Sequence, residues 1–195
     1  DKSELKARVK TQLRRKQYQD DLRSELEESF DLSTKDGLTG VFNRRYFDIH
    51  IAQMTEKAKS SGQKLCLMML DMDHFKNVND SYGHPAGDAV LKTLTNSLKS
   101  SFRVTDLIAR YGGEEFMVLL GNITIEQGSV IAEKTRATIE AIDFIIPDHS
   151  QPLKKTTSIG IVEFNPVESA QDFINRADKA LYEAKETGRN KVVVG

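Results

Sequence analysis

The chain of 195 residues contains a single cysteine, Cys66, so no disulfide can form within it. Cys66 lies in the apolar run Leu65–Leu70, where a buried structural thiol is expected rather than a reactive one. No apolar stretch approaches the roughly 18 residues of a membrane span, and no secretory signal is visible. These absences agree with a reducing compartment, and we expect a cytoplasmic location.

A surplus of charge of either sign is also missing. Lys and Arg number 28 and Asp and Glu number 29, which gives a net charge of −1. Nothing in this balance points to a nucleic-acid partner or to an anionic membrane. Any phosphate-binding site must therefore be a local arrangement of charges. The first residue is Asp1 rather than Met, so we expect a fragment of a longer protein that carries a sensory domain, and room for a membrane anchor, upstream.

The segment 1–30 lacks both glycine and proline and is rich in charged residues, which predicts a helix. Its apolar residues form a narrow, broken stripe with a spacing of four, interrupted by the polar segment 14–17. The pattern favours a coiled-coil stalk. The alternative is a solvated helix that packs back on the domain. We therefore predict a stalk over residues 1–30 and a globular domain over residues 31–195.

Helical and strand patterns alternate after residue 31. A continuous apolar run at 64–72 predicts a central strand buried on both faces, and Gly112-Gly113 between two short strands predicts a hairpin. Because one hairpin is antiparallel, we predict an α+β fold of the ferredoxin-like or nucleotide-cyclase-like kind, with helices flanking the sheet. The predicted helices are 39–61, 74–82, 86–102, 124–142 and 167–187, and the strands are 64–72, 107–111, 115–120, 156–164 and 191–194.

Acidic residues stand at two points of this predicted sheet. Asp71 and Asp73 end the apolar strand, and Glu114 and Glu115 follow the two hairpin glycines. If the strands pair centrally, Asp71 and one glutamate come together. Mg²⁺ is commonly held by one or two such carboxylates together with substrate phosphates. Taken singly, each feature has a plainer reading, since Asp-x-Asp often caps a helix and Gly-Gly-Glu-Glu is often an exposed turn.

Long stretches of the chain resemble the GGDEF domain family, in its variant with Glu at the third position. The resemblance covers residues from about 31 to 195, and the matching motifs occur in the family's order. These motifs are Asp36–Gly40, Asn43–Arg45, Asp71–Asp88, Gly112–Phe116, Ser158–Gly160 and Ala177–Asn190.

This resemblance implies a diguanylate cyclase, which condenses two GTP into cyclic di-GMP and releases two pyrophosphates. Two metal ions per active site, Mg²⁺ or Mn²⁺, are implied for the in-line attack of each 3′-hydroxyl on the other α-phosphate. The implied metal ligands are the Asp71 carboxylate, the Met72 main-chain carbonyl, Glu114 and Glu115. Glu114 is also the implied general base, although a metal-bound carboxylate is a poor base.

The resemblance also implies the nucleotide contacts. Asn79 and Asp88 are expected to read the guanine edge, for which an amide and a carboxylate are chemically suited. His84 is expected to line the pocket, and its alternative is a turn residue that caps a helix. Lys76, Lys185 and Arg189 are expected to neutralise the triphosphate.

Lys185 and Arg189 are four residues apart, so they lie on one helix face if the helix extends that far. Their alternative is an ordinary solvated face.

An inhibitory product site is expected at Arg103 and Asp106, which precede Gly112 by the family's spacing. Arg can bind guanine O6 and N7, and Asp can accept from N1 and N2. The alternative is a plain connection between a helix and a strand. The expected behaviour is noncompetitive inhibition by cyclic di-GMP.

The implied mechanism needs a functional homodimer, with one GTP on each protomer. Three other functions remain open from the residues. They are a catalytically silent module that senses GTP or cyclic di-GMP, a different nucleotide cyclase or polymerase-like palm, and a purely structural dimerisation domain.

Overall fold

The computed structural model describes residues 12, 15–16, 18–19 and 29–195. The chain divides into two units, residues 1–35 and residues 36–195. In the first unit, residues 29–34 are helical. Most of the predicted stalk lies outside the described residues, so it stays a prediction. No helix within the described part of the chain is both long and apolar enough to cross a membrane.

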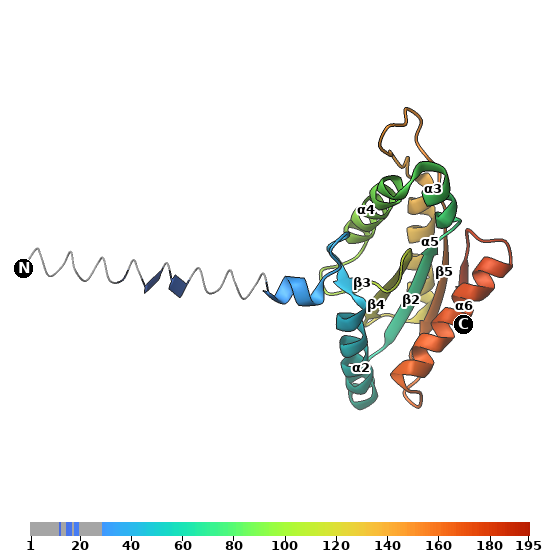
Figure 1. Cartoon of the computed structure of the whole chain (residues 1–195). Helices are drawn as coiled ribbons and strands as arrows, with labels where there is room; N and C mark the ends of the chain where they lie inside the picture. Colours follow the sequence, from blue (N-terminus) through green and yellow to red (C-terminus); the bar gives the residue numbers. More distant parts are fainter. Residues whose placement is uncertain (1–11, 13–14, 17, 20–28) are drawn as a thin grey trace, which may run out of the picture. The chain divides into compact units, whose positions relative to one another are not determined.

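The second unit is built on a six-stranded sheet in the order β1-β3-β4-β2-β5-β6 (Figure 1). The central pairs β3–β4, β4–β2 and β2–β5 are antiparallel, whereas the edge strands β1 and β6 pair in parallel. The strands are β1 (Phe42–Asn43), β2 (Leu65–Met72), β3 (Leu107–Arg110), β4 (Glu115–Gly121), β5 (Thr157–Glu163) and β6 (Val192–Val194).

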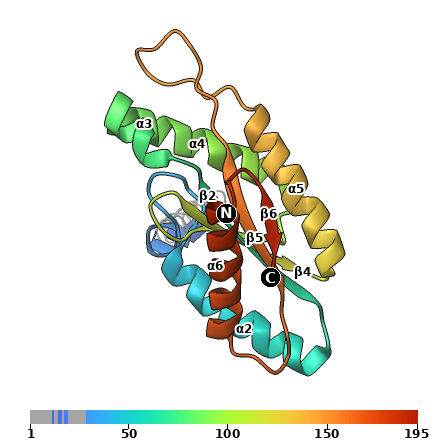
Figure 2. The same ribbon diagram turned by 90° about the vertical axis from the view of Figure 1, so that its right-hand side faces the viewer.

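Helices cover both faces of this sheet (Figure 2). Helices α2 and α6 pack on one face, and α4 and α5 pack on the other, so the apolar side chains form two clusters. Strand β2 contributes alternate residues to the two clusters and is buried throughout, as its continuous apolar run predicts. The helices are α2 (Arg44–Ser61), α3 (Phe75–Tyr82), α4 (His84–Ser101), α5 (Ile125–Ala141) and α6 (Ala170–Glu186).

The predicted α+β class is confirmed, with an antiparallel centre and helices on both faces. The largest boundary error is the start of the first helix of this unit, which we predicted at Thr39 and which begins at Arg44. The Asp36 carboxylate accepts hydrogen bonds from the Thr39 N–H and hydroxyl, and this turn delays the helix. Asn43 then caps the helix by accepting from the Tyr46 N–H. The short strand β1 was not predicted.

The last long helix also begins later than predicted, at Ala170 rather than Val167. Ser169 and Asp172 form a reciprocal capping box that fixes this start. Helix α6 then packs very closely on β5 because Gly160 carries no side chain. A Cβ at Gly160 would lie 2.3 Å from the Leu181 nitrogen and 2.5 Å from the Ala177 oxygen. This close contact brings the end of α6 near the end of β2.

Candidate active site

The pairing of β2 with β4 places Asp71 directly opposite Glu115. The hairpin between β3 and β4 closes tightly, since the Tyr111 N–H donates to the Glu115 carbonyl at 2.8 Å. The Glu115 carboxylate lies over Gly112, where a Cβ would stand 2.5 Å from Glu115 Oε2. The expectation that Asp71 and a hairpin glutamate come together is therefore met by the strand register.

Asp71 is a buried carboxylate with a basic partner. Its side chain is 9% exposed, and the Lys185 Nζ lies 2.8 Å from its Oδ2. Burial raises the pKa of Asp71 to about 6, against the opposing effect of Lys185 and with further help from the charges of Glu114 and Glu115. The three carboxylates are thus close enough to influence one another, and Lys185 favours the ionised form of Asp71.

The donor set at this point suits a hard divalent cation. Asp71, Glu114 and Glu115 offer carboxylate oxygens, and Met72 offers a main-chain carbonyl at the end of β2. Among the residues that the structure describes, no group of three or more His, Cys, Asp or Glu side chains forms a ready-made ion cage. Mg²⁺ typically takes one or two carboxylates and completes its shell with water and substrate phosphates. The residues present fit that mode of binding.

Asp73 does not join this group. Its carboxylate accepts hydrogen bonds from the hydroxyls of Ser158 and Thr156, both at 2.7 Å, and from the Asn190 N–H at 3.0 Å. These bonds tie the end of β2 to β5 and to the segment after α6. The role of Asp73 in this structure is therefore to join these elements.

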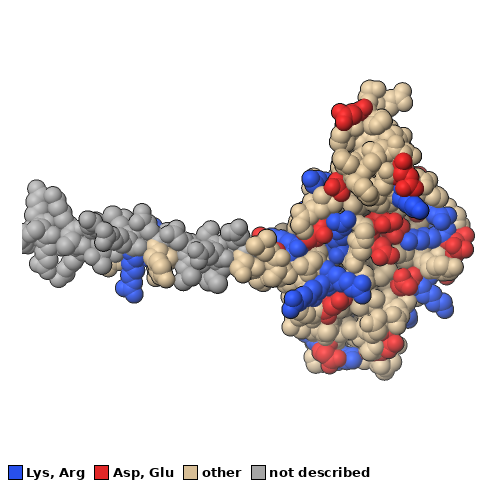
Figure 3. Space-filling model, viewed as in Figure 1, with Lys and Arg blue, Asp and Glu red and all other residues tan. Residues whose placement is uncertain are grey.

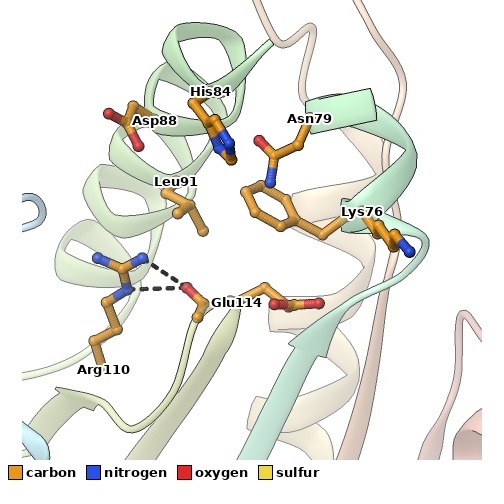
Figure 4. A pocket seen from close by; sticks show the side chains of 9 residues that line it. Lys76, Asn79, His84, Asp88, Leu91, Arg110 and Glu114 are labelled. Carbon is orange, nitrogen blue, oxygen red and sulfur yellow. Dashed lines mark hydrogen bonds between the residues drawn. The ribbon is translucent and has the colours of Figure 1, made fainter. Parts of the chain in front are cut away.

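A cavity of about 410 Å³ opens beside the hairpin (Figure 4). It gathers five of the residues predicted to contact nucleotide or metal. Asn79, His84 and Asp88 lie on one side of it, with Glu114 across from them. The lining residues are Phe75, Lys76, Asn79, His84, Asp88, Leu91, Arg110, Gly113 and Glu114.

Gly87 makes room for Asn79 in this cavity. A Cβ at Gly87 would lie 2.0 Å from Asn79 Oδ1 and 3.1 Å from Phe75 Cζ. The side chain of Asn79 therefore occupies the space that any other residue at position 87 would fill. Sequence reasoning missed this role, although a glycine in the first turns of a helix was a signal of close packing.

Arg110, which lies across the cavity from Asn79, holds the hairpin turn in place. Its Nε and Nη2 donate to the Gly113 carbonyl at 3.0 and 2.7 Å, and its Nη1 lies 3.1 Å from Asp36 Oδ1. Burial acts to raise the pKa of Asp36, but hydrogen bonds from Thr39 and Arg110 outweigh it and hold that pKa below its ordinary value. Sequence reasoning gave neither Arg110 nor Asp36 a role.

Lys185 and Arg189 do not share a helix face, because the helix does not extend as far as Arg189, which was the condition for that expectation. Helix α6 ends at Glu186, and Gly188, Arg189 and Asn190 follow with positive φ angles of 115°, 59° and 46°. The left-handed backbone turns Arg189 away from the row that begins at Lys185. Both residues lie outside the cavity lining.

The comparisons with known proteins agree on one family. Residues 33–191 match the family model described as "Diguanylate cyclase, GGDEF domain". The chain belongs to the GGDEF family. This match includes every residue of the site described above.

Two curated relatives of this GGDEF domain are longer proteins, and the chain matches only part of each. The response regulator PleD of Caulobacter vibrioides is 38% identical over 194 residues, covering 99% of this chain and 43% of PleD. The probable diguanylate cyclase DgcT of Escherichia coli is 44% identical over 164 residues, covering 84% of this chain and 36% of DgcT. The chain spans about two fifths of the curated relatives that it matches.

A solved structure of the coiled coil and GGDEF domain of DgcB from Caulobacter crescentus, in complex with c-di-GMP, has the same fold. Its TM-score is 0.87 at 31% identity, with 98% of this chain and 99% of that chain covered.

Basic and acidic side chains intermingle on the face seen in Figure 3, and neither sign dominates it. The charges of the site are therefore local.

Arg103 and Asp106 lie in the turn between α4 and β3 of the GGDEF domain. Asp106 Oδ2 accepts from the Arg103 N–H at 2.9 Å, and the Asp106 N–H donates to the Arg103 carbonyl at 3.0 Å. Asp106 thus closes the turn through main-chain contacts and leaves the Arg103 side chain exposed. Both residues precede β3, the strand that leads to the hairpin.

Proposed function

We propose that this GGDEF domain is a diguanylate cyclase that converts two GTP into cyclic di-GMP and two pyrophosphates. The observation that carries the proposal is the strand register that sets Asp71 opposite Glu115, with Glu114 on the wall of the adjacent cavity. The family and the named cyclase among the relatives support it.

Guanine is the base that the cavity suits. Asp88 can accept hydrogen bonds from the guanine N1–H and N2–H groups, and the Asn79 amide can both donate and accept. Adenine cannot pair with Asp88 in the same way and would leave these polar groups without their partners, so we expect it to bind less tightly. His84 lies beside them and would contact the bound nucleotide.

Asp71, Glu114, Glu115 and the Met72 carbonyl would hold Mg²⁺ or Mn²⁺, two ions for each active site. Such ions, when bound, offset the negative charge of the triphosphate and lower the pKa of the attacking hydroxyl. Glu114 lies on the cavity wall and accepts the proton of the 3′-hydroxyl. The new bond joins that 3′-oxygen to the α-phosphorus of the other GTP, and the bond to the leaving pyrophosphate breaks.

The triphosphate needs positive charge from the chain itself. Lys76 stands on the cavity wall, Lys185 stands at Asp71, and Arg189 is exposed beyond the end of α6. Lys185 pairs with Asp71, and its flexible stem would let it turn to a phosphate oxygen. Catalysis then comes mainly from positioning and charge, as in other phosphoryl transfers.

Two protomers complete the reaction because one cavity holds one GTP. We infer a C₂ homodimer in which each 3′-hydroxyl attacks the partner's α-phosphorus. The coiled-coil stalk predicted over residues 1–30 would set this dimer geometry and connect it to an upstream sensory domain. The product, cyclic di-GMP, would bind Arg103 and Asp106 and inhibit the enzyme away from the cavity.

Incubation with GTP and Mg²⁺, followed by chromatography of the products, tests this function. We expect cyclic di-GMP from the wild type, and none from Asp71→Asn or Glu114→Gln. Glu56→Gln, which changes an exposed carboxylate paired with Lys59, should retain the activity. Binding of GTP without any turnover would contradict the proposal and favour a silent sensing domain.

A further inference from the structure

The segment that carries Arg189 has an unfavourable backbone. Gly188, Arg189 and Asn190 all have positive φ angles, and a left-handed arginine persists only when its surroundings hold it. The Arg189 N–H donates to the Ala184 carbonyl at 3.0 Å, which fixes the start of the segment. The contacts of Asn190 fix its end.

Two side chains of helix α5 form hydrogen bonds with the side chain of Asn190. Arg136 Nη1 donates to Asn190 Oδ1, and Asn190 Nδ2 donates to Glu140 Oε1, both at 2.7 Å. Arg136 Nη1 also donates to Glu140 Oε2 at 2.7 Å, so the three side chains form a closed ring. Hydrogen bonds from Arg136 and Asn190 lower the pKa of Glu140, so the ring contains a full carboxylate charge at neutral pH.

The main chain of Asn190 reaches the metal-binding end of β2. Its N–H donates to Asp73 Oδ2 at 3.0 Å, and the same carboxylate accepts from Ser158 and Thr156. Asn190 is thus fixed at both its amide group and its backbone. Because Arg189 directly precedes Asn190 in the chain, these contacts also restrict the position of the Arg189 backbone.

We propose that Arg136, Glu140 and Asn190, which we call the α5 bracket, hold Arg189 in the orientation that meets the triphosphate. The inference rests on the proposed role of Arg189 in GTP binding. None of the three bracket side chains lines the nucleotide cavity. They are positioning residues, and α5 thereby contributes to phosphate binding without touching the substrate.

Two ligands separate positioning from general damage. We would titrate the α,β-methylene analogue of GTP, and separately GMP, into each variant by calorimetry. Asn190→Ala and Arg136→Gln should weaken binding of the analogue about tenfold, the effect of losing one charge-assisted contact. Binding of GMP should stay within about twofold of wild type, because GMP lacks the β- and γ-phosphates, to which we assign Arg189.

Glu133→Gln is the matched control. Glu133 Oε1 accepts from Arg136 Nε and Nη2 at 2.9 and 2.7 Å, and Asn190 receives its bonds from Arg136 Nη1 and Glu140 instead. This variant should bind both ligands as the wild type does. Equal loss of GMP and analogue binding in the bracket variants would overturn the proposal, since it would show a role in the fold alone.

Arg189→Ala separates this inference from the proposed function. If Arg189→Ala binds the analogue normally, the assigned role of Arg189 is wrong. If Arg189→Ala weakens analogue binding while Asn190→Ala and Arg136→Gln do not, the bracket is refuted and the role of Arg189 stands. The double variant Arg136→Gln/Arg189→Ala should bind no more weakly than Arg189→Ala, and additive losses would also refute the bracket.

Discussion

Lys185 Nζ lies 2.8 Å from Asp71 Oδ2, so a residue expected to bind phosphate is the counter-ion of one expected to bind metal. The pair joins the last turn of α6 to the end of β2. The positive charge of Lys185 stabilises the ionised form of the buried Asp71 carboxylate. The affinity of this site for a divalent cation should therefore depend on both residues.

Metal binding should weaken as the pH falls through about 6. Burial raises the pKa of Asp71 to about 6, so the carboxylate takes up a proton at a higher pH than an ordinary aspartate. Its ionised fraction falls from about nine tenths at pH 7 to about one tenth at pH 5. Since a metal binds only the ionised form, Mn²⁺ affinity without nucleotide should fall about tenfold over this range. Electron paramagnetic resonance of free Mn²⁺ measures it.

Lys185→Met provides the internal check on this pH dependence. Lys185 lowers the pKa of Asp71, so its removal should move the midpoint for loss of Mn²⁺ binding to higher pH. Lys179→Met, which removes an exposed charge from the same helix, should leave the midpoint in place. A Mn²⁺ affinity that is constant between pH 5 and 7 in the wild type would contradict the assignment.

Gly87→Ala should reduce discrimination for guanine. The new Cβ would overlap Asn79 Oδ1 and force that side chain out of its place in the cavity. We expect GTP to bind about tenfold more weakly and its advantage over ATP to shrink. Competition between the two nucleotides for a fluorescent analogue measures both.

Gly128→Ala is the matched control, because it adds the same methyl group to a helix away from the cavity. There the new Cβ meets the flexible end of Ile161 at 2.9 Å, which can move aside. Unchanged nucleotide preference in Gly87→Ala would show that Asn79 does not read the base.

Arg110→Lys should slow catalysis by loosening the hairpin. Lysine lacks the fork that reaches the Gly113 carbonyl and Asp36 together. We expect turnover to fall about tenfold, and the double variant with Asp36→Asn to fall by less than the two single effects combined. A coupling of about 1–3 kcal/mol in this cycle fits a shared contact. Independent effects would place Arg110 and Asp36 in separate roles.

Arg103→Ala should relieve inhibition by the product. The guanidinium is exposed in the turn that Asp106 closes, where it can reach the O6 and N7 of a guanine. The concentration of cyclic di-GMP that halves the initial rate should rise about tenfold or more. A wild-type rate that saturating cyclic di-GMP leaves unchanged would eliminate this regulatory site altogether.

The centre of the fold and of the site follows from local sequence patterns. The continuous apolar run predicts β2, and the glycine pair predicts the hairpin, so the meeting of Asp71 with a hairpin glutamate is expected once the strands pair. Asn79, His84 and Asp88, which the family motif groups together, line one cavity, and their contacts with a nucleotide stay a prediction. These features depend on alternation, turn chemistry and family motifs, which are all visible in one chain.

The supporting contacts could not be predicted in this way. Arg110 and Asp36 are 74 residues apart, and Arg136 and Asn190 are 54 apart, so no periodic pattern links the members of either pair. The end of α6 was predicted to within one residue, but the apolar stripe does not reveal the left-handed stretch at residues 188–190 that follows it. Such side-chain contacts depend on how the elements pack.

The stoichiometry of the reaction tests the central claim most directly. The chain would be incubated with GTP and Mg²⁺, the nucleotide product identified by mass spectrometry, and pyrophosphate counted by phosphorus NMR. We predict cyclic di-GMP with two pyrophosphates for each molecule formed. A product of 3′,5′-cyclic GMP with one pyrophosphate, or GTP that binds and stays intact, would contradict the account.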